Sequence, residues 1–120
     1  MYRVFTKWIL IAIAALLVLP VRAAPVQVTA KTLFDSCSSD MQSVGYAGCR
    51  RYMMEFVRRA RPKISEGNWG GICVPPDITS DEVSAAFVHV ARSREDFLIG
   101  PSDRAVRTAL QVTYPCPRTR

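Results

Sequence analysis

The chain has 120 residues, enough for one small domain, and a formal net charge of +6 at pH 7. Three of its sixteen basic residues (Arg3, Lys7 and Arg22) lie in the N-terminal segment discussed next. The remainder carries thirteen basic and ten acidic residues, a net charge of +3. This mild balance argues against a nucleic-acid partner, which calls for a strongly basic surface.

The N-terminus, residues 1–23, is predicted to be a cleaved signal peptide. Basic residues precede an apolar run over 8–21, and small residues up to Ala23 place the cut before Ala24. The alternative is an uncleaved membrane anchor, but a run of fourteen residues is short of the roughly 20 that span a bilayer. We expect residues 24–120 to form a single exported helical domain, with no membrane attachment after cleavage.

The first two predicted helices are separated by a polar break. Residues 30–37 form a short helical candidate with apolar side chains on one side. Residues 44–61 have apolar side chains at spacings of three and four, typical of an amphipathic helix. Pro62 is expected to end this helix, because the residue before a proline avoids the helical conformation.

The last two predicted helices follow a loop rich in glycine and proline. Thr79 and Glu82 have the spacing of a capping box and predict a helix over 80–92. Ser102 is expected to start a helix over 102–113 as a polar residue at its N-terminus. These segments complete the set of predicted helices.

The predicted fold class is all-α, a small disulfide-linked bundle of about four helices. The only alternating pattern, over residues 26–30, is short and terminal, so no strand is predicted. Thr113 is expected among the buried residues of the last helix. Short connections favour antiparallel neighbours.

Four cysteines follow the predicted signal, at Cys37, Cys49, Cys73 and Cys116, with gaps of 11, 23 and 42 residues. No close pair suits a zinc site, and no C-x-x-C suits a redox site, so we expect structural disulfides and no metal. Spacing alone leaves three connectivities open. The helix pattern favours Cys37–Cys49 at one end of the bundle and Cys73–Cys116 at the other.

The residue pattern offers no catalytic set. His89 is the only histidine and lies in the middle of a predicted helix. No nucleophile, metalloprotease or phosphate-binding motif accompanies it. We expect a protein that is not an enzyme and takes no cofactor.

Two segments resemble contact surfaces: the glycine-rich loop around Trp69, and residues 93–102, which join two helices. Apolar anchors on a rigid cross-linked frame are what a protein–protein contact needs. The alternative is that these apolar groups pack back over the small core. The candidate partner-binding residues are Trp69, Arg94, Glu95, Asp96, Phe97 and Ile99.

Five arginines cluster along the second predicted helix. A solvated helix face is the simpler interpretation, and a patch for an acidic partner or an envelope polyanion is the other. The cluster consists of Arg50, Arg51, Arg58, Arg59 and Arg61.

Four ordered motifs resemble the Rap/Tai family of immunity proteins. They are Cys37, C-R-R-Y-M-M-E-F over 49–56, G-I-C-V-P-P-D-I-T over 71–79 and A-L-Q-V-T-Y-P-C over 109–116. The resemblance implies a small exported helical protein that binds a peptidoglycan amidase effector of type VI secretion and blocks its cleft, often as a homodimer. The chain departs from the family pattern at Ser93-Arg94-Glu95-Asp96, where members often carry a His-Pro-Glu-like turn.

Two functions follow from the sequence. The first is a periplasmic immunity protein that occludes an amidase cleft with residues 93–102 and nearby helix surface. The second is a structural or accessory envelope protein of the same fold, with no toxin partner, that uses its arginine face.

Overall fold

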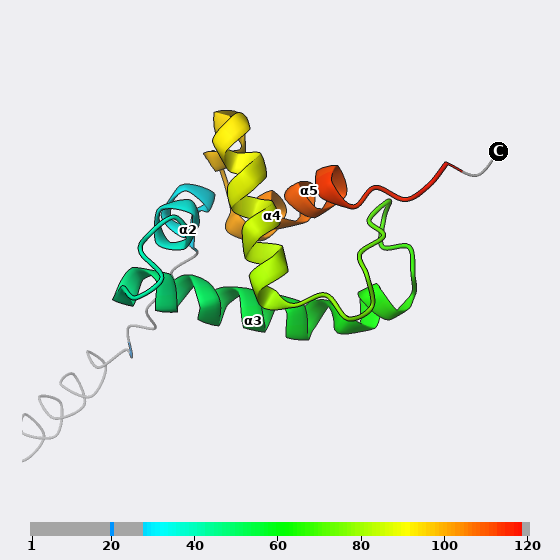
Figure 1. Ribbon diagram of the computed structural model, residues 1–120, viewed down its shortest axis with the longest axis horizontal. Coiled ribbons are helices and arrows are strands. Elements are labelled where there is room, and N and C mark those ends of the chain that lie inside the picture. The colour runs from blue at the N-terminus through cyan, green and yellow to red at the C-terminus, as the bar shows by residue number, and fades with distance from the viewer. Residues whose placement is uncertain (1–19, 21–27, 119–120) are drawn as a thin grey trace, which may run out of the picture.

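The computed structural model describes Pro20 and residues 28–118 (Figure 1), so the predicted signal peptide and its cleavage site lie outside the described residues apart from Pro20. Within 28–118 the chain forms four α-helices, one 3₁₀ helix and no strand, which confirms the all-α fold class. The elements are α2 (Ala30–Cys37), α3 (Val44–Ser65), α4 (Ser80–Ser93), η2 (Glu95–Leu98) and α5 (Ser102–Thr113).

Short polar side chains start three of the helices. The Thr29 hydroxyl caps α2 and the Ser43 hydroxyl caps α3, each accepting from a free backbone N–H of the first turn. The predicted capping box is confirmed: Thr79 and Glu82 each bond the other's backbone N–H at the start of α4.

Helix α5 begins at Ser102, as predicted, but no side chain caps it. Pro101 occupies the position before the helix and gives no side-chain cap, and Ser102 is the first helical residue. The Ser102 hydroxyl lies 2.8 Å from the Tyr52 hydroxyl instead of capping its own backbone. A tertiary hydrogen bond therefore takes the place of the expected local one.

Pro62 does not end α3, contrary to the sequence-based expectation; it lies inside the helix. The next turn is held by tertiary contacts that a local rule cannot include. Ile64 is buried, and the Arg61 guanidinium donates to the carbonyl oxygens of Pro76 and Ile78 at 2.7 and 3.0 Å. These contacts offset the missing N–H of the proline. The helix ends before Gly67, whose φ of +83° suits glycine.

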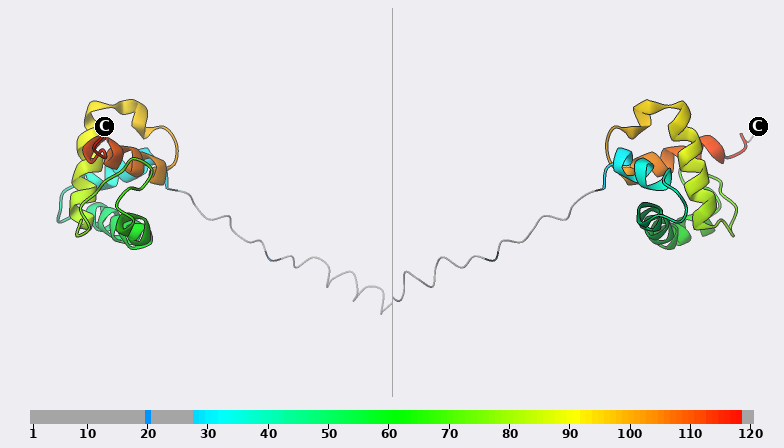
Figure 2. Two further views of the ribbon diagram at one scale, coloured as in Figure 1. Left: turned by 90° about the vertical axis from the view of Figure 1, so that its right-hand side faces the viewer. Right: turned by 60° about the vertical axis from the view of Figure 1, so that its left-hand side comes forward.

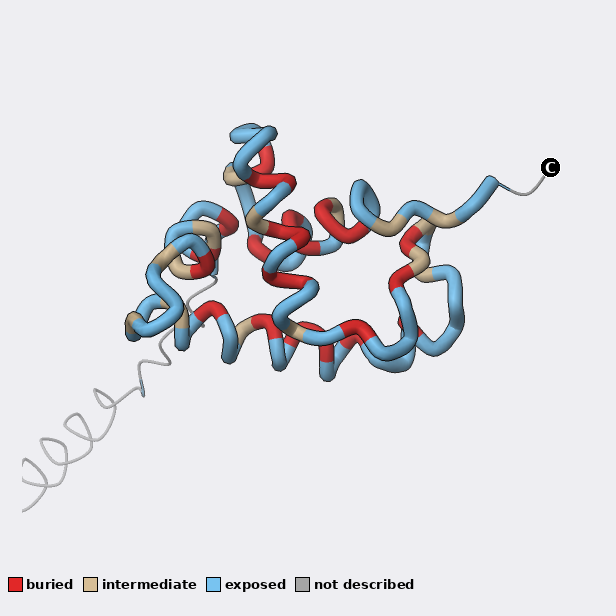
Figure 3. Tube along the Cα trace, in the orientation of Figure 1, coloured by how far each residue is buried: buried red, intermediate tan, exposed pale blue. Residues whose placement is uncertain are grey.

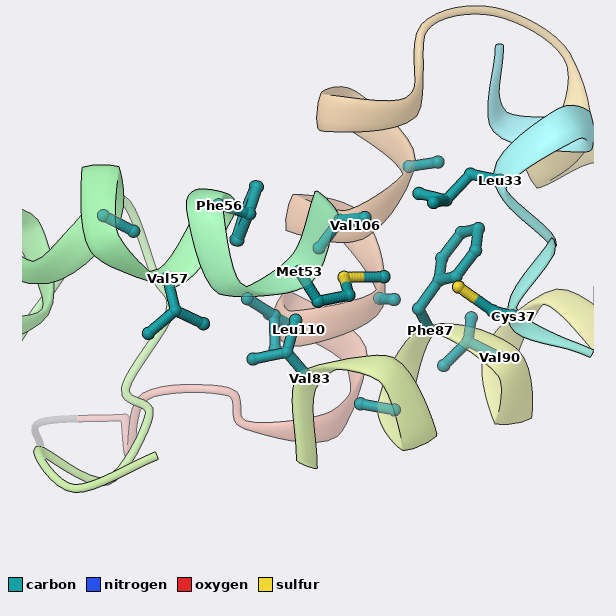
Figure 4. Close-up of a cluster of buried hydrophobic side chains, with 14 of the residues drawn as sticks. Leu33, Cys37, Met53, Phe56, Val57, Val83, Phe87, Val90, Val106 and Leu110 are labelled. Atoms are coloured by element: carbon teal, nitrogen blue, oxygen red, sulfur yellow. The ribbon is translucent and has the colours of Figure 1, made fainter. Parts of the chain in front are cut away.

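The core lies where α3, α4 and α5 meet, with α2 closing one side. Figure 4 shows Met53 from α3, Phe87 from α4 and Leu110 from α5 side by side, all fully buried. Phe34 of α2 contacts the Phe87 ring edge-on, with centroids 6.5 Å apart. Thr113 is exposed, contrary to expectation, because the last turn of α5 leaves the core.

Helix α4 crosses α3 steeply (Figures 1 and 2). The connection over residues 66–79 is long, so it does not constrain its two helices as a short turn would. Buried residues line the inner side of α3, and its outer side is exposed along most of its length (Figure 3). Among the helices described, none combines the length and apolarity needed to cross a membrane.

Both disulfides have the predicted connectivity. Cys37–Cys49 joins the end of α2 to α3, and Cys73–Cys116 joins the 66–79 loop to the chain after α5. Helices α2 and α3 approach closely beside the first bond, where a Cβ added to Gly48 would lie 3.5 Å from the Ser36 hydroxyl oxygen.

Cys73→Ser/Cys116→Ser should lower the free energy of unfolding by about 4 kcal/mol, because that disulfide closes a loop of 43 residues in the unfolded chain. Both cysteines are only half-buried, so serine introduces little cavity. Urea unfolding of the oxidised wild type and of the variant measures the difference. A loss below about 1 kcal/mol would contradict the chain-entropy account.

Candidate partner-binding site

Residues 93–102 form a braced connection between α4 and α5 that contains the 3₁₀ helix η2. Arg94 leaves the helical conformation and ends α4, and η2 then turns its apolar residues to different sides. Phe97 is 7% exposed and packs into the core, Leu98 packs against the core, and Ile99 is 86% exposed. The sequence could not tell which of these would face solvent.

Arg94 organises the outer surface of this connection. Its guanidinium donates to Asp96 Oδ2 at 3.0 Å and lies over the Phe97 ring, 4.8 Å from the centroid. The hydrogen bond from Arg94 holds the pKa of the Asp96 carboxyl below its ordinary value, so Asp96 stays ionised. The three side chains therefore form one layered unit with little net charge.

A hollow of about 170 Å³ opens between this connection and α5. Four of the six candidate residues line it: Arg94, Asp96, Phe97 and Ile99. On the α5 side it is lined by Arg104, Ala105 and Thr108, with Pro101 between. Glu95 is exposed on η2 next to the hollow and does not line it.

The C-terminal end of the connection is tied to the start of α2. Gly100 has a φ of +104°, a conformation that favours glycine, and its carbonyl accepts from the Ala30 N–H at 3.0 Å. The Ser102 N–H donates to the Val28 carbonyl at 3.2 Å. The short alternation over 26–30 was the only sequence signal for this pairing, and residues 26 and 27 lie outside the described part.

Tyr52 ties the same end to α3. Its hydroxyl donates to the Asp103 carboxylate and contacts the Ser102 hydroxyl at 2.8 Å. Burial, together with the Asp103 hydrogen bond, raises the pKa of Tyr52 to about 12. Arg59 on α3 pairs with Asp103 at 3.7 Å. These contacts fix the point where the connection meets α5.

Trp69 lies apart from this hollow, on the loop over 66–79. Gly70 and Gly71 both have positive φ and form a tight turn in which Trp69 and Ile72 exchange backbone hydrogen bonds. The half-buried indole packs against Phe56, with centroids 6.2 Å apart, and Arg107 lies over its outer face. The structure therefore does not bring Trp69 together with the other five candidates.

The described residues offer a contact surface and no metal-binding cluster. Within 28–118, no three His, Cys, Asp or Glu side chains are placed to hold a metal ion. His89 is exposed on α4. The fold and the site together define a small helical protein, cross-linked at both ends, that presents a braced loop for contact.

Residues 29–116 match the model of the Rap1a immunity proteins, and the chain belongs to this family. Immunity proteins act by binding a protein effector and inhibiting it, which agrees with the contact surface described above. Neither a search of curated proteins nor a search of solved structures gave a match.

The raised pKa of Tyr52 predicts how stability depends on pH. Tyrosine in the unfolded chain loses its proton near pH 10.0, whereas folded Tyr52 keeps it up to about pH 12. The contribution of Tyr52 to the free energy of unfolding is therefore complete below pH 10 and is lost as the pH rises from 10 through 12. Tyr52→Phe should remove this fall, and at neutral pH it should cost about 1–2 kcal/mol through the lost hydrogen bonds. Urea unfolding across this pH range measures both effects.

The matched control is Tyr46→Phe, on the outer side of α3, which should leave the alkaline fall in place. Tyrosinate absorbance gives a second readout: the wild type should show a step near pH 12 that the Tyr52→Phe variant lacks. Equal alkaline falls in wild type and Tyr52→Phe would contradict the assignment.

Proposed function

We propose that the protein is an exported immunity protein that binds a peptidoglycan amidase effector of type VI secretion and blocks its active cleft with residues 93–102. Family membership supports a protein effector as partner. The sequence motifs resemble those of proteins whose effectors are amidases. The observation that carries the proposal is Ile99, a large apolar side chain 86% exposed on a connection braced at both ends.

The braced connection suits insertion into a cleft. Phe97 anchors it from below, and the bonds at Gly100 and Ser102 fix its far end. Such a segment loses little conformational entropy on binding, so more of the contact energy contributes to affinity. Ile99 would enter the cleft as the apolar anchor, and occupation of that space would exclude the peptidoglycan substrate.

The hollow beside Ile99 supplies the complementary feature. Its volume of about 170 Å³ suits one side chain from the rim of the effector's cleft. Arg94 and Asp96 on its wall are already paired, so they offer positioned hydrogen-bonding groups at low ordering cost. Glu95 lies on the exposed side of η2 and would face the partner at the edge of the contact. Trp69, in a separate place, would contribute only to a partner that extends along α5.

The periplasm is the proposed location. Residues 1–23 would act as the signal peptide and 24–120 would be the working domain. The two disulfides support this location, because such bonds form and persist in oxidising compartments. The family resemblance also suggests a homodimer, which remains an expectation.

The alternative is an envelope protein that binds anionic polymers through the arginine cluster. The contacts of these arginines weaken that alternative. Arg61 bonds backbone carbonyls, Arg58 pairs with Glu55, and Arg59 pairs with Asp103. Of the five, only Arg50 and Arg51 form neither an ion pair nor a hydrogen bond within the described part of the chain. Three of the five arginines are thus already bonded to groups of the protein itself.

Ile99→Asp should weaken binding to the cognate amidase about 30-fold, because it places a charge in the proposed apolar contact (~2 kcal/mol). The amidases encoded in the same genome are the partners to screen. Calorimetric titration measures affinity, and digestion of purified cell wall measures inhibition, which should be lost in parallel.

The control is Val44→Asp, which makes the same kind of change at a residue 91% exposed at the start of α3. It should leave affinity within about twofold, and both variants should unfold at the wild-type urea concentration. Wild-type affinity in Ile99→Asp would refute the role of the loop. Failure of the wild type to bind any of the amidases would refute the proposed partner.

Export predicts a defined mature N-terminus. Protein recovered from the periplasmic fraction should begin at Ala24, and an intact-mass measurement should show the loss of residues 1–23. Its cysteines should resist alkylation until a reductant is added. A full-length chain retained in the membrane fraction would instead support an uncleaved anchor.

A further inference from the structure

The outer face of α3, which the proposed function does not use, carries two apolar hollows. The first, of about 840 Å³, lies over the side of α3 that includes Tyr46 and Met54, and Met41 also lines it. The second, of about 420 Å³, lies between α2 and α3 and is lined by Leu33 and Tyr52 among others. Gly48 also lines it, and a Cβ added there would lie 3.5 Å from the Ser36 hydroxyl oxygen.

The two hollows are neighbours on one surface. Arg51 and Glu55 line both, so these side chains form the ridge between the hollows. Met41 is 68% exposed and Met54 is 58% exposed. Flexible methionines at a surface adapt to the shape of a partner's apolar groups. We call this surface, over both hollows and their ridge, the α3 outer face.

The α3 outer face is positively charged, and only some of its arginines have an acidic partner. Glu55 is the only acid that lines either hollow, and it pairs with Arg58 and Arg59. Arg51 forms no ion pair or side-chain hydrogen bond within the described chain, and Arg50 lies only over the Tyr46 ring. Two cations therefore border apolar hollows, and neither is paired with a carboxylate of the described residues.

We propose that the α3 outer face is a second docking surface, which binds an acidic amphipathic helix of a protein partner. Carboxylates of that helix would face Arg50 and Arg51, and its apolar side chains would enter the hollows on either side of the ridge. This is the helix-in-groove mode of recognition, with charge complementarity at the rim.

Charge decides against a second copy of the chain as the occupant. A symmetric dimer through this face would bring the same patch of each protomer together. Arg50 and Arg51 would then meet the arginines of the other protomer, and Glu55 is already engaged. Like charges face each other in that arrangement, whereas an acidic helix neutralises them.

The α3 outer face is separate from the braced connection. No residue that lines either of its hollows also lines the hollow beside Ile99. The inner side of α3 faces the core, so its outer side points away from α4 and α5 (Figure 3). Arg51 and Met54 can therefore be altered without touching residues 93–102, whereas Tyr52, at the edge of the second hollow, bonds Ser102.

The test uses a synthetic acidic amphipathic helical peptide with leucine on one face and glutamate beside it. Methyl NMR of protein labelled at methionine reports the site directly, because Met41 and Met54 are exposed while Met53 is buried in the core. We expect the peptide to shift the methyl signals of Met41 and Met54 and to leave that of Met53 in place. Arg51→Glu should weaken peptide binding at least tenfold.

Two control variants keep the result specific. Arg92→Glu makes the same charge change on α4 and should leave peptide affinity within twofold, as should Ile99→Asp on the braced connection. These measurements do not involve an amidase, so their outcome does not depend on the proposed function.

Three outcomes would overturn the proposal. The first is equal binding of a peptide with lysine in place of glutamate, which would remove the charge argument. The second is equal binding of an acidic peptide with serine in place of leucine, which would indicate a simple polyanion surface. The third is a concentration-dependent dimer that shifts Met54 without peptide, which would make a second copy the occupant.

Discussion

The disulfide between Cys37 and Cys49 is the constraint on which the rest of the structure depends. It holds the end of α2 against α3, while the start of α2 pairs with residues 100–102. Helix α2 has only eight residues and would be marginal alone. Fixed at both ends, it packs against α3, α4, α5 and η2, so the braced connection rests on an element that cannot move away.

The residues that carry the family resemblance act in this framework. Cys49 makes the first disulfide, and Tyr52, one turn later, bonds the start of α5. Cys73 and Cys116 make the second disulfide. These residues hold the fold in place, whereas Ile99 lies outside every one of these motifs. Family membership therefore follows from the scaffold, whereas the proposed partner contact lies outside these motifs, on residues 93–102.

Local patterns were sufficient to predict the helices and, through them, both disulfides. The bounds of α2 and α5 agree with the sequence, because their apolar periodicity and flanking polar residues are local signals. Pro62, which was expected to end α3, lies inside that helix, and the Ser102 hydroxyl bonds Tyr52; both features depend on contacts with distant residues. The sequence pointed to residues 93–102 as a candidate contact segment, but it could not separate Phe97 from Ile99, because η2 and the packing of Phe97 arise only in the folded chain.

The two exposed surfaces differ in the kind of complementarity they offer. On the braced connection, Arg94 and Asp96 neutralise each other, and Ile99 projects beside them, so shape and apolar contact dominate there. On the α3 outer face, Arg50 and Arg51 lack carboxylate partners among the described residues, so charge guides what approaches. Charge acts mainly on the rate of encounter, and salt screens it, whereas a buried apolar anchor acts mainly on the rate of dissociation. Ile99 and Arg51 can therefore change independently, while Tyr52 links the second hollow to the start of α5.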